Sequence, residues 1–204
     1  MKKYVAITFD DGPNTSVTPL MLDCLKRHHA VATFFLNGKN INEKTAAIME
    51  RQVRMGCELE NHSTYHRNMT GMTVEQIADD VRMTNERIYQ YTSRYPQFFR
   101  PPFMLIHNRM FETVEMPFIC GKGSADWSPD EPPEETARII LSKVKPADII
   151  LLHDAETNAK SARALDMILT ELSSQEYHFV TVSQLFRIHK VKFQRNKLYT
   201  NVLE

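Results

Sequence analysis

Short apolar runs alternate with amphipathic stretches along the whole chain. The short runs are rich in β-branched and aromatic residues, which favours strands. The longer stretches repeat their apolar residues every three or four positions, which favours helices. We predict strands at 4–9, 32–36, 58–61, 98–100, 118–121, 149–152 and 179–182, and helices at 17–28, 43–55, 74–94, 107–114, 133–144 and 161–173.

Strict alternation of strand and helix predicts parallel strands joined by right-handed crossovers. Seven such strands form either a barrel or an open doubly wound sheet. No repeat, low-complexity segment or linker divides the chain, so we expect a single domain over residues 1–204. In both architectures reactive residues collect at the carboxyl ends of the strands. Candidate chemistry is therefore expected directly after each strand.

Charge and composition exclude several classes of partner. Lys plus Arg and Asp plus Glu both number 25, so the formal net charge is zero. This balance predicts neither a nucleic acid nor an anionic membrane surface as partner, and it fits a neutral substrate such as a carbohydrate. No apolar run approaches the roughly 20 residues that a membrane span needs. The sequence leaves the oligomeric state open.

The first apolar run resembles a signal peptide only briefly. Asp10 and Asp11 end it before the ~7–15 apolar residues of such a segment are reached. Three widely spaced cysteines indicate neither a full disulfide set nor a cysteine-type zinc site. Free core thiols favour a reducing compartment. We expect a cytoplasmic protein as the sequence is written, or a secreted or cell-surface protein if an export signal has been removed.

The first predicted strand ends in two adjacent carboxylates. The segment from residue 8 to residue 13 reads Thr-Phe-Asp-Asp-Gly-Pro, so a Gly-Pro turn holds Asp10 and Asp11 at the strand's carboxyl edge. An Asp-rich turn without chemistry has the same composition. Taken alone, the motif does not separate these interpretations.

The third predicted strand ends in a histidine pair. His62 and His66 are four residues apart and lie close enough to share a metal ion. Such pairs also arise by chance in a chain with eight histidines. Here a carboxylate from the first strand completes a set of three ligands. Two imidazoles and one carboxylate leave coordination positions open, which is typical of a catalytic metal site.

Four further polar or aromatic residues lie at or after the ends of later strands. Arg100 precedes two prolines and can hold a carboxylate ionised, or it can form a surface ion pair. Trp127, the single tryptophan, follows Asp126 and could instead pack in the core. His153 ends the strand at 149–152, where a buried structural histidine is also common. All of these residues fall on the same predicted rim.

These segments, in this order, resemble the polysaccharide deacetylase family (carbohydrate esterase family 4, the NodB-homology domain). The matching motifs are TFDDGP (8–13), HSTYH (62–66), RPPF (100–103), ADW (125–127) and LLHD (151–154). The resemblance spans nearly the whole chain. It implies an α/β fold, a distorted, incomplete (β/α)7 barrel similar to a TIM barrel, with parallel strands and outer helices. A chain shorter than the ~250 residues of a full barrel agrees with this.

The resemblance also implies a role for each matching residue. Asp11, His62 and His66 would bind a divalent metal ion, most often zinc, with cobalt, nickel or manganese as alternatives. The expected general base is Asp10, which Arg100 would tether and keep ionised. His153 would be the general acid. Asp126 would pair with Arg100 or with His153. Trp127 and Leu151 would line a slot for the acetyl methyl group, and the backbone N–H of Phe103 would stabilise the oxyanion.

The implied function is metal-dependent hydrolysis of N- or O-acetyl groups on a carbohydrate. The chemistry is coherent, because a metal ion polarises the carbonyl and lowers the pKa of its bound water towards ~7. Two positions depart from the family pattern. Gly123 stands where the family often has an aspartate, and Glu60 stands two residues before His62. We hypothesise that Glu60 supports His62 or lies inside the barrel, unless a twisted strand end turns it to solvent.

Other functions remain open at this point. The substrate could be an acetylated glycan or oligosaccharide, an acetylxylan-type ester, or a non-sugar amide. A sugar-binding module on a decayed enzyme fold is a further alternative, since fold alone does not guarantee activity. Glycoside hydrolysis by paired carboxylates is another, but it does not require the histidines.

Overall fold

The protein is described here by a computed structural model that covers residues 2–204. Its strands are β1 (Lys3–Asp10), β2 (Thr33–Leu36), β3 (Glu58–Asn61), β4 (Phe118–Ile119), β5 (Ile149–His153), β6 (Tyr177–Val180) and β7 (Leu198–Tyr199). Its α-helices are α1 (Val17–Arg27), α2 (Glu43–Arg54), α3 (Val74–Thr92), α4 (Asn108–Thr113), α5 (Pro133–Leu141), α6 (Lys160–Ser174) and α7 (Val182–Ile188). Two short 3₁₀-helices are η1 (Gly38–Asn40) and η2 (Pro102–Met104).

The strands form a distorted, incomplete parallel barrel. β3, β2, β1 and β5 pair in that order, and β6 pairs with the first half of β1. Isolated parallel bridges continue the ring from Asn61 to Phe99, from Phe99 to Phe118 in β4, and from Lys122 to Ile150 in β5. The ring thus closes through single bridges where regular strands are missing. This confirms the predicted barrel over the open sheet.

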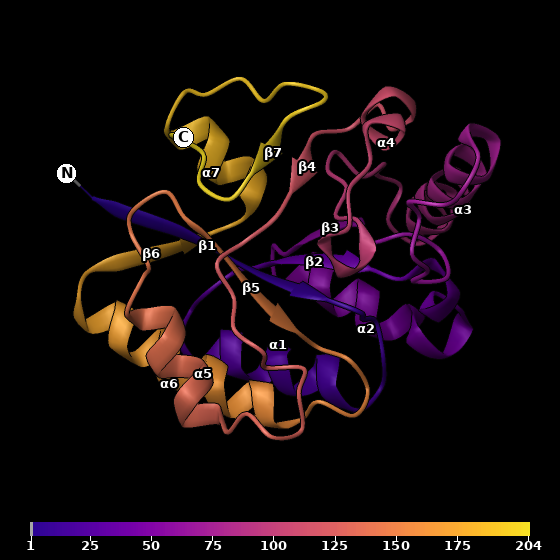
Figure 1. The fold of residues 1–204 in the computed structure, drawn as a ribbon. Helices are drawn as coiled ribbons and strands as arrows, with labels where there is room; N and C mark the ends of the chain where they lie inside the picture. Colours follow the sequence, from indigo (N-terminus) through magenta and orange to yellow (C-terminus); the bar gives the residue numbers. More distant parts are fainter. Residues whose placement is uncertain (1) are drawn as a thin grey trace.

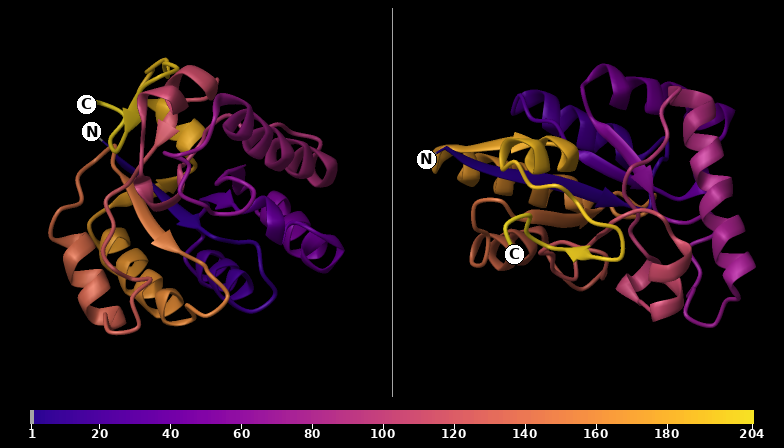
Figure 2. Two further views of the ribbon diagram at one scale, coloured as in Figure 1. Left: turned by 45° about the vertical axis from the view of Figure 1, so that its right-hand side comes forward. Right: turned by 90° about the horizontal axis from the view of Figure 1, so that it is seen from above.

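The helices lie outside the strands (Figures 1 and 2). α5 and α6 lie side by side on one flank of the barrel, and α2 and α3 lie together on another. The largest apolar cluster joins the outer faces of β1, β2 and β5 to these helices, with Phe9, Phe34 and Leu152 fully buried. Burying one such side chain contributes about 1.5–3 kcal/mol. This packing fixes the strand ends that carry the polar residues.

Several predicted element boundaries were wrong. The strand expected at 98–100 is reduced to a bridge at Phe99. Pro101 and Pro102 follow it, and prolines have no N–H to continue a ladder. The strand expected at 179–182 ends at Val180, because Thr181 instead caps α7 by a capping box with Gln184. Neither α7 nor β7 was predicted.

Local sequence signals mark two of the helix ends. Thr73 and Gln76 form a capping box at the start of α3. Gly56 follows the end of α2 with a positive φ of 80°, a conformation that glycine adopts without strain. Among residues 2–204, no helix combines the length and the hydrophobicity needed to cross a bilayer.

Candidate active site

The polar residues predicted at strand ends lie at one end of the barrel. Asp10 is the last residue of β1 and pairs in register with His153, the last residue of β5. His62 follows the end of β3, and its backbone N–H donates to the carbonyl of Leu36 at the end of β2. Because the strands are parallel, their carboxyl ends meet at this edge. The strand register therefore brings together the ends of β1 and β5, which are more than 140 residues apart in the sequence.

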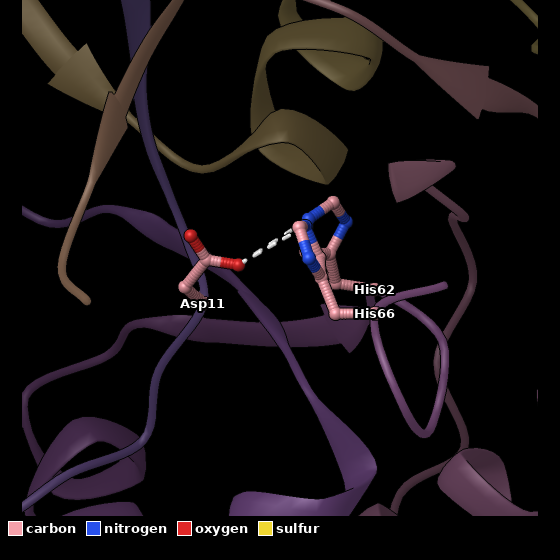
Figure 3. Close-up of side chains that lie close together, drawn as sticks. All are labelled: Asp11, His62 and His66. Carbon is pink, nitrogen blue, oxygen red and sulfur yellow. Dashed lines mark ion pairs between the residues drawn. The ribbon is translucent and has the colours of Figure 1, made fainter. Parts of the chain in front are cut away.

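Asp11, His62 and His66 form one group of potential metal ligands. Their ligand atoms all lie within 4.8 Å of one another. Asp11 Oδ1 is 3.3 Å from His66 Nε2 and 3.7 Å from His62 Nε2. Figure 3 shows the carboxylate of Asp11 directed at the two imidazole rings. Ligand atoms around a cation with bonds near 2.1 Å are roughly 3–3.5 Å apart, so the spacing fits a metal ion.

The protonation of the two histidines also fits a metal ion. His62 Nδ1 is 2.7 Å from the carbonyl oxygen of Arg100, which accepts only, so Nδ1 carries the proton and Nε2 is free to bind. Burial and the neighbouring His62 lower the pKa of His66. His66 is therefore neutral near pH 7, which is the form that binds metals.

Asp10 forms a buried ion pair with Arg100. Asp10 Oδ1 is 2.6 Å from Arg100 Nη1, and the arginine side chain is 0% exposed. The other guanidinium nitrogens donate to the carbonyls of Ile119 and Cys120, and the ring of Phe35 lies 4.0 Å from the guanidinium. Burial raises the pKa of Asp10, but the charges of Arg100 and then of the nearby histidines outweigh it and lower the pKa overall. Asp10 is therefore ionised.

Asp126 pairs with His153 and not with Arg100. Asp126 Oδ1 lies 2.7 Å from His153 Nδ1, and Asp126 Oδ2 accepts hydrogen bonds from the backbone N–H of His153 and the hydroxyl of Ser161. Burial lowers the pKa of His153, but the hydrogen bond and charge of Asp126 outweigh it and raise the pKa to about 9. His153 is therefore a protonated imidazolium near neutral pH.

These groups open into one cavity of about 660 Å³. Phe103, Trp127 and Leu151 line it, as the sequence predicts. Trp127 is 64% exposed, so it is not a core residue. Phe103 has a positive φ of 58°, which bends the backbone at the cavity rim and lays its ring 4.5 Å from the ring of His66. Lining residues not predicted are Pro101, Met104, Cys120, Gly121, Gly123 and Ser124.

Gly123 fits closely where it stands. A Cβ at this position would lie 2.9 Å from the carbonyl oxygen of Leu151, closer than real contacts allow. A larger residue would therefore require the backbone to shift.

The hypothesis that Glu60 supports His62 is wrong. The Glu60 carboxylate instead accepts hydrogen bonds from the backbone N–H groups of Gln97 and Phe98, both at 2.7 Å. Glu60 is 2% exposed, which also excludes the solvent-facing alternative. It lines a separate cavity with Glu58.

Sequence reasoning missed the residues that hold the Asp11 turn in place. The buried Asp154 carboxylate accepts hydrogen bonds from the backbone N–H of Gly12 at 3.0 Å and the hydroxyl of Thr18 at 2.6 Å. A Cβ at Gly12 would lie 2.5 Å from Asp154 Oδ2, so only glycine fits there. Burial raises the pKa of Asp154 to about 7. In the sequence, the signal for Asp154 was its position directly after His153 at the end of a strand.

Two asparagines after β2 also contact Asp11. Asn37 Nδ2 donates to Asp11 Oδ1 at 3.1 Å, and Asn40 Nδ2 donates to the backbone carbonyl of Asp11 at 2.8 Å. The signal in the sequence was a polar residue directly after the buried run Thr33–Leu36.

A second group of potential ligands lies between α1 and α6. It contains Cys24, His28 and Asp166. Arg27 Nη2 lies 2.9 Å from the same Asp166 oxygen that faces His28, so a cationic side chain already occupies this position. His29, His107, His178 and His189 also lie outside the cavity described above, and His107 caps α4.

Comparisons with known proteins agree with this geometry. The family model for polysaccharide deacetylase matches residues 1–116. A bifunctional xylanase/deacetylase from Pseudobutyrivibrio xylanivorans is 41% identical over 202 residues, which cover 98% of this chain and 33% of the relative. The chain thus spans about a third of the length of that relative.

Two solved structures cover almost the whole chain. One is the Xyl-CE4 domain of a multidomain xylanase from the hindgut metagenome of Trinervitermes trinervoides, with a TM-score of 0.97, 39% identity and coverage of 100% of this chain and 99% of that one. The other is a family 4 acetyl xylan esterase from Clostridium thermocellum in complex with a cobalt ion, with a TM-score of 0.95, 36% identity and coverage of 98% and 99%. This chain therefore belongs to the polysaccharide deacetylase family.

Proposed function

We propose that this protein hydrolyses acetyl groups on an acetylated glycan or oligosaccharide, at a divalent cation held by Asp11, His62 and His66. The observation that carries the proposal is the meeting in one cavity of three metal-type ligands, an ionised Asp10 and a protonated His153. Zinc is the first choice of metal, and cobalt, nickel and manganese are alternatives. A relative of known structure contains a cobalt ion.

A divalent cation in such a site polarises a carbonyl oxygen and makes water more acidic. The protein side chains then divide the proton transfers. Asp10, kept ionised by Arg100 at 2.6 Å, takes a proton from the attacking water. The water oxygen adds to the acetyl carbonyl carbon. A positioned base of this kind contributes roughly 10²–10⁴-fold in rate.

The second proton transfer completes the hydrolysis. His153 carries a proton on each ring nitrogen, and Asp126 holds Nδ1 at 2.7 Å, so Nε2 is the donor. It protonates the leaving nitrogen or oxygen as the bond to the carbonyl carbon breaks. The products are acetate and a free amine or hydroxyl group. Trp127 and Leu151 would enclose the acetyl methyl group, and the backbone N–H of Phe103 would stabilise the charged oxygen.

An ester substrate is the main alternative to an amide. Relatives are named as deacetylases of peptidoglycan and as an acetyl xylan esterase, so both bonds are candidates. The two depend differently on His153, because an amine cannot leave unprotonated, whereas an alkoxide is a better leaving group. We expect His153→Ala to lower amide cleavage more than ester cleavage.

The direct test is acetate release from a panel of substrates. The panel contains N-acetylated chitooligosaccharides, peptidoglycan and acetylated xylan, each with chelator and with metal added back. Loss of acetate release with chelator and its recovery with metal support the proposal. Absence of release from every substrate would favour a sugar-binding module, and chelator-insensitive cleavage of glycosidic bonds would favour a glycoside hydrolase.

A further inference from the structure

Asn37 is placed beside the Asp11 turn by the sheet register. Asp10 in β1 pairs with Phe35 in β2, so the two strands run side by side to their carboxyl ends. Beyond the strands, the backbone N–H of Asn37 donates to the carbonyl of Gly12 at 2.9 Å. The backbone therefore places residue 37 beside Asp11. The side chain at position 37 determines which group contacts Asp11.

The carboxamide of Asn37 binds the oxygen of Asp11 that faces the histidines. Its Nδ2 donates to Asp11 Oδ1 at 3.1 Å. This same oxygen is 3.3 Å from His66 Nε2 and 3.7 Å from His62 Nε2. The hydrogen bond therefore acts on the atom that completes the ligand group.

This contact sets the orientation of the Asn37 amide and leaves its oxygen without a hydrogen-bond partner among residues 2–204. A carboxylate accepts hydrogen bonds and cannot donate them, so the amide must turn its N–H₂ group to Asp11. Asn37 is 3% exposed, and its Oδ1 has no hydrogen-bond partner among residues 2–204. A buried acceptor without a partner is unfavourable. An apolar residue of similar size would avoid that loss, so the retained amide points to its contact with Asp11.

Other residues hold the backbone of the turn. Asn40 donates to the carbonyl of Asp11, and Asp154 accepts from the N–H of Gly12. Asn37 instead donates to the Asp11 carboxylate itself, at the oxygen that also lies near His66. Its side chain therefore affects the rotamer of Asp11 separately from the path of the main chain.

We infer that Asn37 is a positioning residue, whose carboxamide holds the Asp11 carboxylate towards His62 and His66 and thereby sets the affinity for the cation. The inference rests on the proposed cation site. Carboxylates that bind metals are themselves hydrogen-bonded, and loss of such a partner lowers metal affinity by about 10–100-fold. No role for Asn37 in proton transfer is involved.

The test compares the binding of Co²⁺ to metal-free wild-type protein and to Asn37→Leu, which has the same branching at Cγ and no donor. We expect the dissociation constant of Asn37→Leu to be about 10–100-fold higher. At saturating Co²⁺ we also expect altered visible absorption bands, because these report the arrangement of the ligands. Asn37→Ala, measured in the same way, serves if the leucine variant does not fold.

Asn42→Ala is the matched control. Asn42 lies in the same loop and caps α2 by accepting from the backbone N–H of Lys44, without contacting Asp11. This variant should unfold at a lower temperature and bind Co²⁺ as the wild type does. Dissociation constants of both Asn37 variants within twofold of the wild type, with unchanged absorption bands, would overturn the role of Asn37. Wild-type protein that fails to bind Co²⁺ would instead overturn the cation site itself.

Discussion

Asp10 and Glu60 are both buried carboxylates in one sheet, yet their pKa values shift in opposite directions. Asp10 is 3% exposed and Glu60 is 2% exposed. Burial alone would raise the pKa of both. Asp10 faces the guanidinium of Arg100, and its pKa is lowered. Burial and then the charge of Glu58 raise the pKa of Glu60 well above its usual value, and the backbone N–H donors of Gln97 and Phe98 offset only part of this.

The difference shows that the charged neighbour, and not burial, decides the direction in which the pKa of a buried carboxylate shifts. Asp10, beside the guanidinium of Arg100, stays charged in the cavity that also contains the potential metal ligands. Glu60, whose pKa is raised, accepts a hydrogen bond from the backbone N–H of Phe98, next to the bridge at Phe99. The following predictions test this contrast between the two carboxylates and their surroundings.

The largest effect is expected at the ligand group near Asp10. His62→Ala should reduce metal affinity by more than about 100-fold, since it removes a ligand and not only a supporting group. Turnover should fall to background. Metal content after dialysis and acetate release measure both. His28→Ala is the control, because His28 pairs with Asp166 outside the cavity and should leave both values unchanged.

The next largest effect is a difference in turnover between variants of the two carboxylates, Asp10 and Glu60. Asp10→Asn should lower turnover by roughly 10²–10⁴-fold, because the base is lost, and should retain bound metal. Glu60→Gln should turn over as the wild type does. Steady-state rates and metal analysis of both variants check this. Normal turnover by Asp10→Asn would show that another group is the base.

A smaller effect is expected in the pH profile. In the proposed mechanism His153 acts in its protonated form, so turnover should fall as the pH rises through its pKa of about 9. Asp126→Asn removes the negative charge that raises this pKa, and the alkaline limb should move to lower pH by roughly 1–3 units. The pH dependence of kcat measures the shift. An unmoved alkaline limb would mean that it reports a different group.

The smallest effect is expected in how the free energy of unfolding depends on pH through Glu60. The pKa of Glu60 is higher in the folded than in the unfolded state, so the folded protein binds more protons and its stability falls as the pH rises above about 4.5. Each unit of difference lowers stability near neutral pH by about 1.4 kcal/mol. Glu60→Gln should flatten this dependence in urea unfolding between pH 4 and pH 8. Parallel curves for both proteins would contradict the assignment.

Much of the fold and the site could be predicted from local patterns. The apolar runs indicated the strands that carry Asp10, His62 and His153, and the parallel alternation predicted that their ends would meet. The strand at 98–100 was predicted wrongly, because a single bridge closes the barrel there. α7 was missed because the β-branched run 180–182, which leads into it, is typical of a strand. The capping box of Thr181 starts a helix there instead.

The sequence by itself determined which residues reach the active end of the barrel, because strand order and direction follow from the apolar pattern. Only the tertiary structure decided which of them touch. It paired Asp126 with His153, turned Glu60 to the backbone of Phe98, and set Asn37 and Asp154 around the Asp11 turn. Hydrogen bonds act over about 3 Å, so they depend on register, rotamer and turn geometry, which local sequence patterns do not encode.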